Sequence, residues 1–128
     1  MKLNYDCVRD TLLVLEEITG FHPGTQVFRK ISLDDIHEHL PDYTMDDIAY
    51  TVCELLDAAY IEGNYVSGIR SSTYIVSNIT WAGHEFLKNI ASESIWKESL
   101  EAIRPLGSVS LSILAQVASA AIMRRLGI

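Results

Sequence analysis

The sequence is poor in cysteine and in basic residues. Its only cysteines, Cys7 and Cys53, lack the paired spacing of a zinc site or a redox motif. This usage excludes a disulfide framework and is typical of a reducing compartment. Ten Lys and Arg stand against 17 Asp and Glu, and the resulting net charge of −7 repels phosphate backbones at long range. The composition therefore argues against a protein that coats nucleic acid.

Long hydrophobic runs are absent as well. The longest uncharged stretch, residues 105–123, contains Gly107, four serines and Gln116, which is too polar for a membrane span. The N-terminus has no uninterrupted apolar stretch, and Arg9 and Asp10 follow closely, so no signal peptide is predicted. We therefore expect a cytoplasmic protein that does not contact a membrane.

The rest of the composition is that of a globular domain. Hydrophobic residues make up 48% and charged residues 21% of the chain, which excludes disorder and low-complexity fibres. A chain of 128 residues is expected to form a single domain, 1–128, with about two-thirds of its unfolded surface buried on folding.

The apolar spacing predicts helices on both sides of a hairpin. It predicts an amphipathic helix over 4–19, and a short extended segment is expected at 27–31. Ser32 and Thr44 are predicted N-caps of two further helices, 32–40 and 44–60, which the tetrad 41–44 joins into a helix-turn-helix. Two segments rich in β-branched and aromatic residues, 60–66 and 73–79, predict the hairpin.

Further helices are predicted after the hairpin. Thr80 is the expected cap of the next one, and helical spacing continues through 95–103. The residues expected to face inward in the helix after Thr80 are Trp81, Phe86, Leu87 and Ile90. The last segment, 108–126, is apolar around most of its circumference.

This order of elements resembles a winged helix-turn-helix domain. Leu55–Gly63 is similar to the junction between helix and wing in that fold, and Ile79–Leu87 is similar to the opening of the helix after the wing. The resemblance implies a mostly α fold with a small β-hairpin wing. Residues 1–91 would form the winged-helix core, and residues 92–128 would form a C-terminal helical extension.

The chain also resembles a family of short bacterial, phage and prophage proteins classed as a domain of unknown function. The residues that carry this resemblance are Met1, Lys2, Asp6, Arg9, Leu13, Ile61–Gly63, Thr80–Leu87, Ile95 and Trp96. The resemblance implies a phage-linked context and no catalytic or binding residues. The chain departs from the pattern at Ala59, where glycine is usual, which argues against a left-handed helix cap there.

The second helix of the helix-turn-helix motif has an acidic face. In DNA-binding members of such folds this helix enters the major groove with basic and amide side chains. Here the segment from Ile31 to Ile69 holds nine acidic residues and no Lys or Arg, which disfavours duplex DNA. The residues expected to point outward as a surface for a protein partner are Asp46, Asp47, Tyr50, Thr51, Glu54 and Asp57. A solvated acidic face is the simpler alternative.

Other groups of polar residues are weaker candidates for a functional site. Arg70 is the single cation of the wing and a candidate phosphate contact, although most such arginines only solvate a hairpin tip. His37 and His39 are two apart on a helix and point in different directions, so no metal site is predicted. No nucleophile elbow, phosphate loop or dinucleotide motif occurs. We therefore expect no catalytic residue, no metal and no cofactor, and hence no enzyme.

The C-terminal helix is a candidate for self-association. A helix packed on one side of a small domain needs an apolar stripe only somewhat wider than 100°, and this one extends further. The candidate dimer residues are Leu111, Leu114, Val117, Ala121 and Ile122. The alternative is that the rest of the same chain covers the helix.

Three functions remain open at this stage. The favoured one is a small non-enzymatic winged-helix protein of phage type that acts through macromolecular association, with a protein partner or a second copy of itself. A DNA-binding transcriptional regulator is the main alternative and rests on fold analogy. An acidic inhibitor that imitates nucleic acid toward a host enzyme is the weakest.

Overall fold

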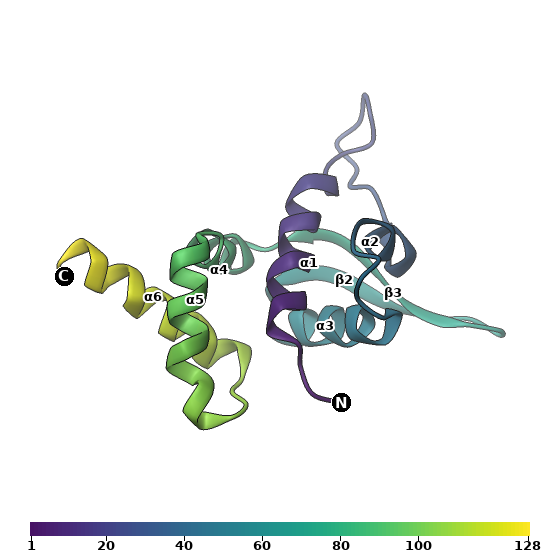
Figure 1. Ribbon diagram of the computed structural model, residues 1–128. Coiled ribbons are helices and arrows are strands. Elements are labelled where there is room, and N and C mark those ends of the chain that lie inside the picture. The colour runs from purple at the N-terminus through teal and green to yellow at the C-terminus, as the bar shows by residue number, and fades with distance from the viewer.

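The computed structural model describes all 128 residues as a mostly helical chain with a small antiparallel sheet (Figure 1). The β2–β3 hairpin projects on one side of the molecule, and the C-terminal helix extends on the opposite side. In chain order the elements are α1 (Tyr5–Ile18), β1 (Ile31–Ser32), α2 (Leu33–His39), α3 (Met45–Asp57), β2 (Ile61–Ser67), β3 (Ser72–Ile79), α4 (Trp81–Ile90), α5 (Glu93–Ile103), the 3-10 turn η1 (Arg104–Leu106) and α6 (Leu111–Leu126).

The predicted N-caps are confirmed. The side chains of Ser32, Thr44 and Thr80 each accept a hydrogen bond from the backbone N–H three residues later. Ser32 also forms a full capping box, because the Asp35 carboxylate accepts from the Ser32 N–H at 2.9 Å. These local bonds satisfy N–H groups that a helix start leaves unpaired and so fix where α2, α3 and α4 begin.

The sheet has the strand order β1-β3-β2, with both pairings antiparallel. The hairpin was expected at these residues, but the predicted extended segment 27–31 is only partly correct. Its regular pairing is limited to Ile31 and Ser32, opposite Val76 and Ile75. The residues before Ile31 instead form an exposed arm, closed by an isolated bridge between Phe21 and Phe28.

The apolar core runs through the whole chain. A cluster of 21 buried residues takes members from every helix and strand, among them Leu12 of α1, Ile48 of α3, Val76 of β3 and Leu114 of α6. The predicted division after residue 91 falls in the turn between α4 and α5. None of the helices is long and apolar enough to cross a lipid bilayer.

The junction from α3 to β2 differs from the prediction. Ala59 has φ of +60°, so the left-handed conformation is present without a glycine. The Tyr60 N–H bonds to the Leu55 carbonyl and the Ala59 N–H bonds to the Leu56 carbonyl, which is the Schellman pattern. These two hydrogen bonds stabilise the turn that leads directly into β2. Their stabilisation outweighs the steric cost of a methyl group in the left-handed conformation.

Close packing then fixes α4 against that junction. A Cβ added to Gly83 would lie 1.9 Å from the Tyr60 carbonyl oxygen, so only glycine fits there. The Thr80 hydroxyl donates to the Ala59 carbonyl at 2.7 Å while it accepts from the Gly83 N–H at 3.0 Å. The first turn of α4 is therefore held rigidly by the end of α3.

Candidate interaction surface

The outward side of α3 is acidic, as the sequence predicts. Asp46 and Asp57 are exposed, and Tyr50 and Glu54 are half-buried on the same side of the helix. We call these four residues the α3 face. Ion pairs within the chain involve only the carboxylates of Asp10 and Glu98, so no cation of the protein neutralises this face. Asp47 is half-buried beside it, in the first turn, where its N–H bonds to Thr44.

Thr51 does not belong to this face, and its prediction as an outward residue is wrong. It is fully buried, and its hydroxyl oxygen has no hydrogen-bond partner. Thr51 comes three residues after Ile48 and four before Leu55, so helical spacing places it on the buried side of α3. A polar residue type suggested exposure where the spacing indicated the core.

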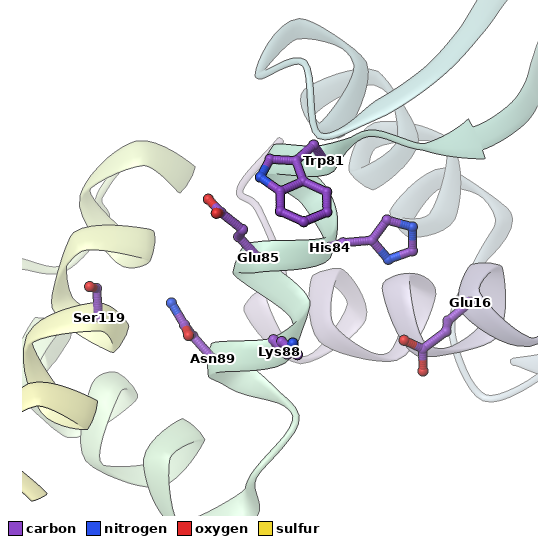
Figure 2. A pocket seen from close by; sticks show the side chains of 7 residues that line it. All are labelled: Glu16, Trp81, His84, Glu85, Lys88, Asn89 and Ser119. Atoms are coloured by element: carbon purple, nitrogen blue, oxygen red, sulfur yellow. The ribbon is translucent and has the colours of Figure 1, made fainter. Parts of the chain in front are cut away.

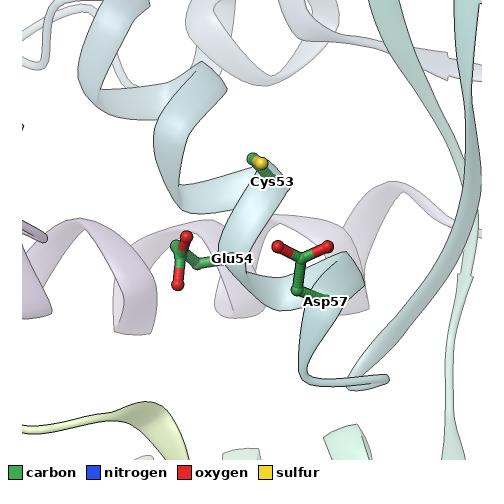
Figure 3. A group of neighbouring side chains, drawn as sticks. All are labelled: Cys53, Glu54 and Asp57. Atoms are coloured by element: carbon green, nitrogen blue, oxygen red, sulfur yellow. The ribbon is translucent and has the colours of Figure 1, made fainter.

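Three side chains near the end of α3 lie close enough to share an ion (Figure 3). The ligand atoms of Cys53, Glu54 and Asp57 all lie within 4.8 Å of one another. The Tyr74 hydroxyl from β3 donates to the Cys53 sulfur at 3.4 Å, and this bond raises the pKa of Tyr74. A structural zinc site takes four ligands, and this group contains only three, all from one helix. Its two carboxylates are those of the α3 face, and the group is not assigned as a metal site.

A shallow groove continues the α3 face toward the hairpin. It has a volume of about 580 Å³ and lies between the end of α3 and the base of β2 and β3, with Asp57 and Glu62 among its lining residues. Arg70 is exposed at the far tip of the hairpin and makes no ion pair. Arg70 lies in the turn between β2 and β3, at the opposite end of the hairpin from Glu62 at the start of β2.

The proposed dimer residues of α6 divide into two groups. Leu111, Leu114 and Ala121 are buried within the chain, so their prediction as a free surface is wrong. Their spacing of three and seven residues forms the side of α6 that packs against α4 and α5. Val117 and Ile122 are half-buried, and the exposed large apolar residues of α6 are Ile113 (42%), Met123 (50%) and Leu126 (68%). Self-association stays a prediction, with a smaller surface than the sequence suggested.

Trp81 is the residue that sequence reasoning placed most wrongly. It was expected to face inward, but its side chain is 80% exposed. Phe86 comes five positions after Trp81, which is about 140° beyond one full turn, so the two side chains leave α4 on widely different sides. The helical spacing indicated that Trp81 is exposed, but the prediction followed its large apolar side chain and placed it inward.

A cleft of about 580 Å³ opens beside Trp81 (Figure 2). Its other lining residues are Glu16 from α1, His84, Glu85, Lys88 and Asn89 from α4, and Ser119 from α6. Trp81 lies between Glu85, which points toward α6, and His84, which points toward α1. Segments far apart in the sequence thus meet around an exposed indole.

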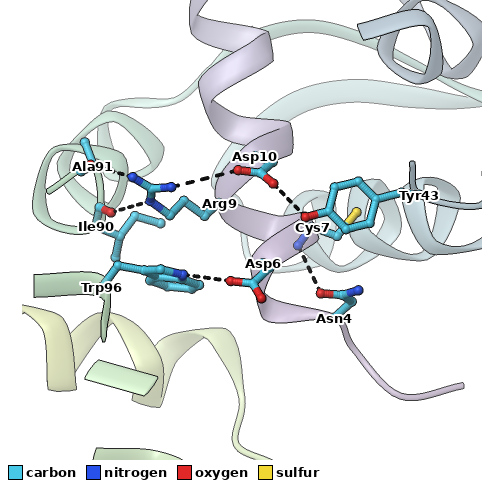
Figure 4. Close-up of polar contacts among 9 residues, drawn as sticks. All are labelled: Asn4, Asp6, Cys7, Arg9, Asp10, Tyr43, Ile90, Ala91 and Trp96. Carbon is cyan, nitrogen blue, oxygen red and sulfur yellow. Dashed lines mark hydrogen bonds and ion pairs between the residues drawn. The ribbon is translucent and has the colours of Figure 1, made fainter. Parts of the chain in front are cut away.

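Several residues that carry the family resemblance are used inside the fold (Figure 4). Asp6 accepts a hydrogen bond from the Trp96 indole at 2.9 Å. Arg9 donates from Nε to the Ile90 carbonyl at 2.9 Å and from Nη2 to the Ala91 carbonyl at 2.7 Å, which satisfies the C-terminal end of α4. These contacts tie α1 to the last helices and leave Asp6 and Arg9 no free binding role.

Comparisons with known proteins give a family and no activity. A family model described as "Hypothetical protein (DUF2513)" matches residues 2–110. A protein of Haemophilus influenzae named "Uncharacterized protein" is 29% identical over 131 residues, which cover 98% of this chain and 99% of that protein. No solved structure matches the chain.

Proposed function

The chain belongs to the DUF2513 family, whose description names no activity, and from its surfaces we propose that it is a winged-helix protein that acts by binding another protein. The winged-helix part rests on the order α1, β1, α2, α3, β2, β3 and on the sheet order β1-β3-β2. In such a fold α3 is the recognition helix and the β2–β3 hairpin is the wing. The phage or prophage context belongs to the same proposal and rests on sequence resemblance.

The observation that carries the proposal is the α3 face. Its carboxylates have no ion-pair partner within the chain, and Tyr50 lies among them. A duplex carries one negative charge about every 1.7 Å, so a recognition helix of this charge is repelled from it. A basic patch on a protein is instead attracted to such a face, and the attraction speeds encounter and selects the partner.

A capture experiment tests this function. The chain is immobilised, exposed to a lysate of its bacterial host, and compared with the variant that carries Asp46→Asn, Glu54→Gln and Asp57→Asn. We expect a specific protein to be retained by the wild type and lost by the variant, and its retention to weaken with salt because exposed charges are screened.

A charge-matched control separates the α3 face from net charge. Glu17→Gln, Glu93→Gln and Glu101→Gln alter three exposed carboxylates elsewhere by the same total charge. This variant is expected to retain the partner. Equal retention by the α3 variant would contradict the proposal.

A further inference from the structure

Trp81 is the most exposed large aromatic side chain in the protein, and its backbone is rigid. The Thr80 and Gly83 contacts that hold the start of α4 fix the Cα of Trp81 relative to α3 and β2. Its 80% exposure contrasts with Trp96, which is 5% exposed. Tryptophan is the residue type most enriched among the side chains that dominate protein interfaces. The backbone that carries this indole is therefore held in place, and the ring itself is uncovered.

The cleft beside Trp81 has an excess of negative charge. Glu85 from α4 lies beside the Trp81 ring, whereas Glu16 from α1 lines the far side of the cleft, beyond His84 (Figure 2). Neither carboxylate forms an ion pair within the chain. Lys88 is the one Lys or Arg that lines the cleft. An indole face attracts a cation through its quadrupole, and neighbouring carboxylates accept the hydrogen bonds of that cation.

We propose that Trp81 and Glu85 form a binding site for the guanidinium group of an arginine side chain on the partner protein. Arginine fits better than lysine because its planar guanidinium stacks on an aromatic ring while its edge donates to carboxylates. The inference deepens the proposed function by naming a group on the partner, and rests on it. The site lies on α4, apart from the α3 face, and so it can be tested alone.

An NMR titration with the peptide acetyl-Gly-Arg-Gly-amide tests the site without the partner. The two indole N–H signals of the protein give a probe and an internal control, since Trp96 donates its N–H to Asp6. We expect the Trp81 signal to shift saturably with a dissociation constant of about 1 to 10 mM, and the Trp96 signal to stay in place. The lysine peptide should bind several-fold more weakly, and the glutamate peptide should not bind.

Variants on the full chain locate the site. Glu85→Gln is expected to weaken binding about threefold to fivefold, because it removes one exposed charge pair. Lys88→Met should tighten binding about twofold or more, since it removes the cation that competes for the cleft. Glu101→Gln on α5 has the same charge change as Glu85→Gln and should leave the affinity unchanged.

Two results would overturn the site. One is a Trp81 signal that does not move with the arginine peptide. The other is equal weakening by Glu101→Gln and Glu85→Gln, which would show general attraction to an acidic protein. Because no partner is present in the titration, either failure leaves the capture result on α3 intact. Loss of capture by the α3 variant, in turn, is measured without reference to Trp81.

Discussion

The polar residues of α1 and those of α3 and α4 are used in opposite ways. On α1, Asp6, Arg9 and Asp10 each bind a group from another part of the chain, namely Trp96, the end of α4 and Tyr43. On the outer sides of α3 and α4 the carboxylates form no ion pair, and the Trp81 ring is uncovered. Figure 4 shows the contacts of α1, and Figures 2 and 3 show carboxylates of α4 and α3.

This contrast shows what the residues that carry the family resemblance do in the structure. Asp6, Arg9 and Trp96 are among the residues that carry it, and their contacts hold the last helices against α1. They therefore explain the fold. Side chains that are free to bind a partner are found elsewhere, on the α3 face and around Trp81.

The two tryptophans give the largest expected contrast. Trp96→Ala should lower the free energy of unfolding by about 3 to 5 kcal/mol, because it removes a buried ring and leaves Asp6 without its donor. Trp81→Ala should change it by no more than about 0.5 kcal/mol, since the ring is exposed. Urea unfolding followed by circular dichroism measures both. Similar losses for the two variants would erase the distinction between the regions.

Arg9 is expected to have the next largest effect. Arg9→Met keeps most of the apolar stem but leaves the Ile90 and Ala91 carbonyls without their charged donor, at a cost of about 2 kcal/mol. Lys88→Met, an exposed cation on α4, is the matched control and should be close to neutral. Thermal unfolding of both variants checks this. An Arg9→Met protein as stable as the control would mean that water replaces the guanidinium at no cost.

The bond between Tyr43 and Asp10 of α1 makes part of the protein's stability depend on pH. Its hydroxyl donates to Asp10 at 2.6 Å, and burial together with that carboxylate raises the pKa of Tyr43 above its usual value. The stability from this bond is present below the unfolded pKa of about 10 and is lost as the pH rises above it. Tyr43→Phe should cost about 1 kcal/mol at pH 7 and should lose less stability than the wild type between pH 10 and 12. Parallel losses in that range would contradict this assignment.

Ala59 gives the smallest expected change, and it is a gain. Replacement of Ala59 by glycine relieves the left-handed conformation at φ of +60° and should stabilise the protein by about 0.5 to 1 kcal/mol. Ala58→Gly, one residue earlier in a right-handed conformation, should instead destabilise it. Chemical denaturation of the pair decides the point, and a loss on Ala59→Gly would show that the strain is absent.

Local rules were sufficient for much of the fold. Ser32, Thr44 and Thr80 were predicted as caps because a capping bond spans only three residues, and the hairpin followed from its β-branched segments. The acidic side of α3 was also predicted from residues close together in the sequence, through their helical spacing. Thr51 and Trp81 were misplaced because residue type was preferred over helical spacing.

Long-range contacts lay outside sequence reasoning. The bond between Asp6 and Trp96 joins residues 90 positions apart, and no local pattern indicates it. The cleft at Trp81 needs Glu16 from α1 and Ser119 from α6, whose approach depends on how the helices pack. The same packing decided which side of α6 is covered, so Leu111 and Leu114 turned out to be core residues.

The most direct test of the central claim is the affinity of the chain for duplex DNA. Fluorescence anisotropy with labelled random duplex and duplex from the native locus, at physiological salt, measures it. The acidic α3 face predicts binding weaker than about 10⁻⁴ M, below the range of ordinary non-specific DNA binding. Micromolar binding that falls with salt and is abolished by Arg70→Glu would contradict the account, and would make the hairpin tip the contact element of a DNA-binding regulator.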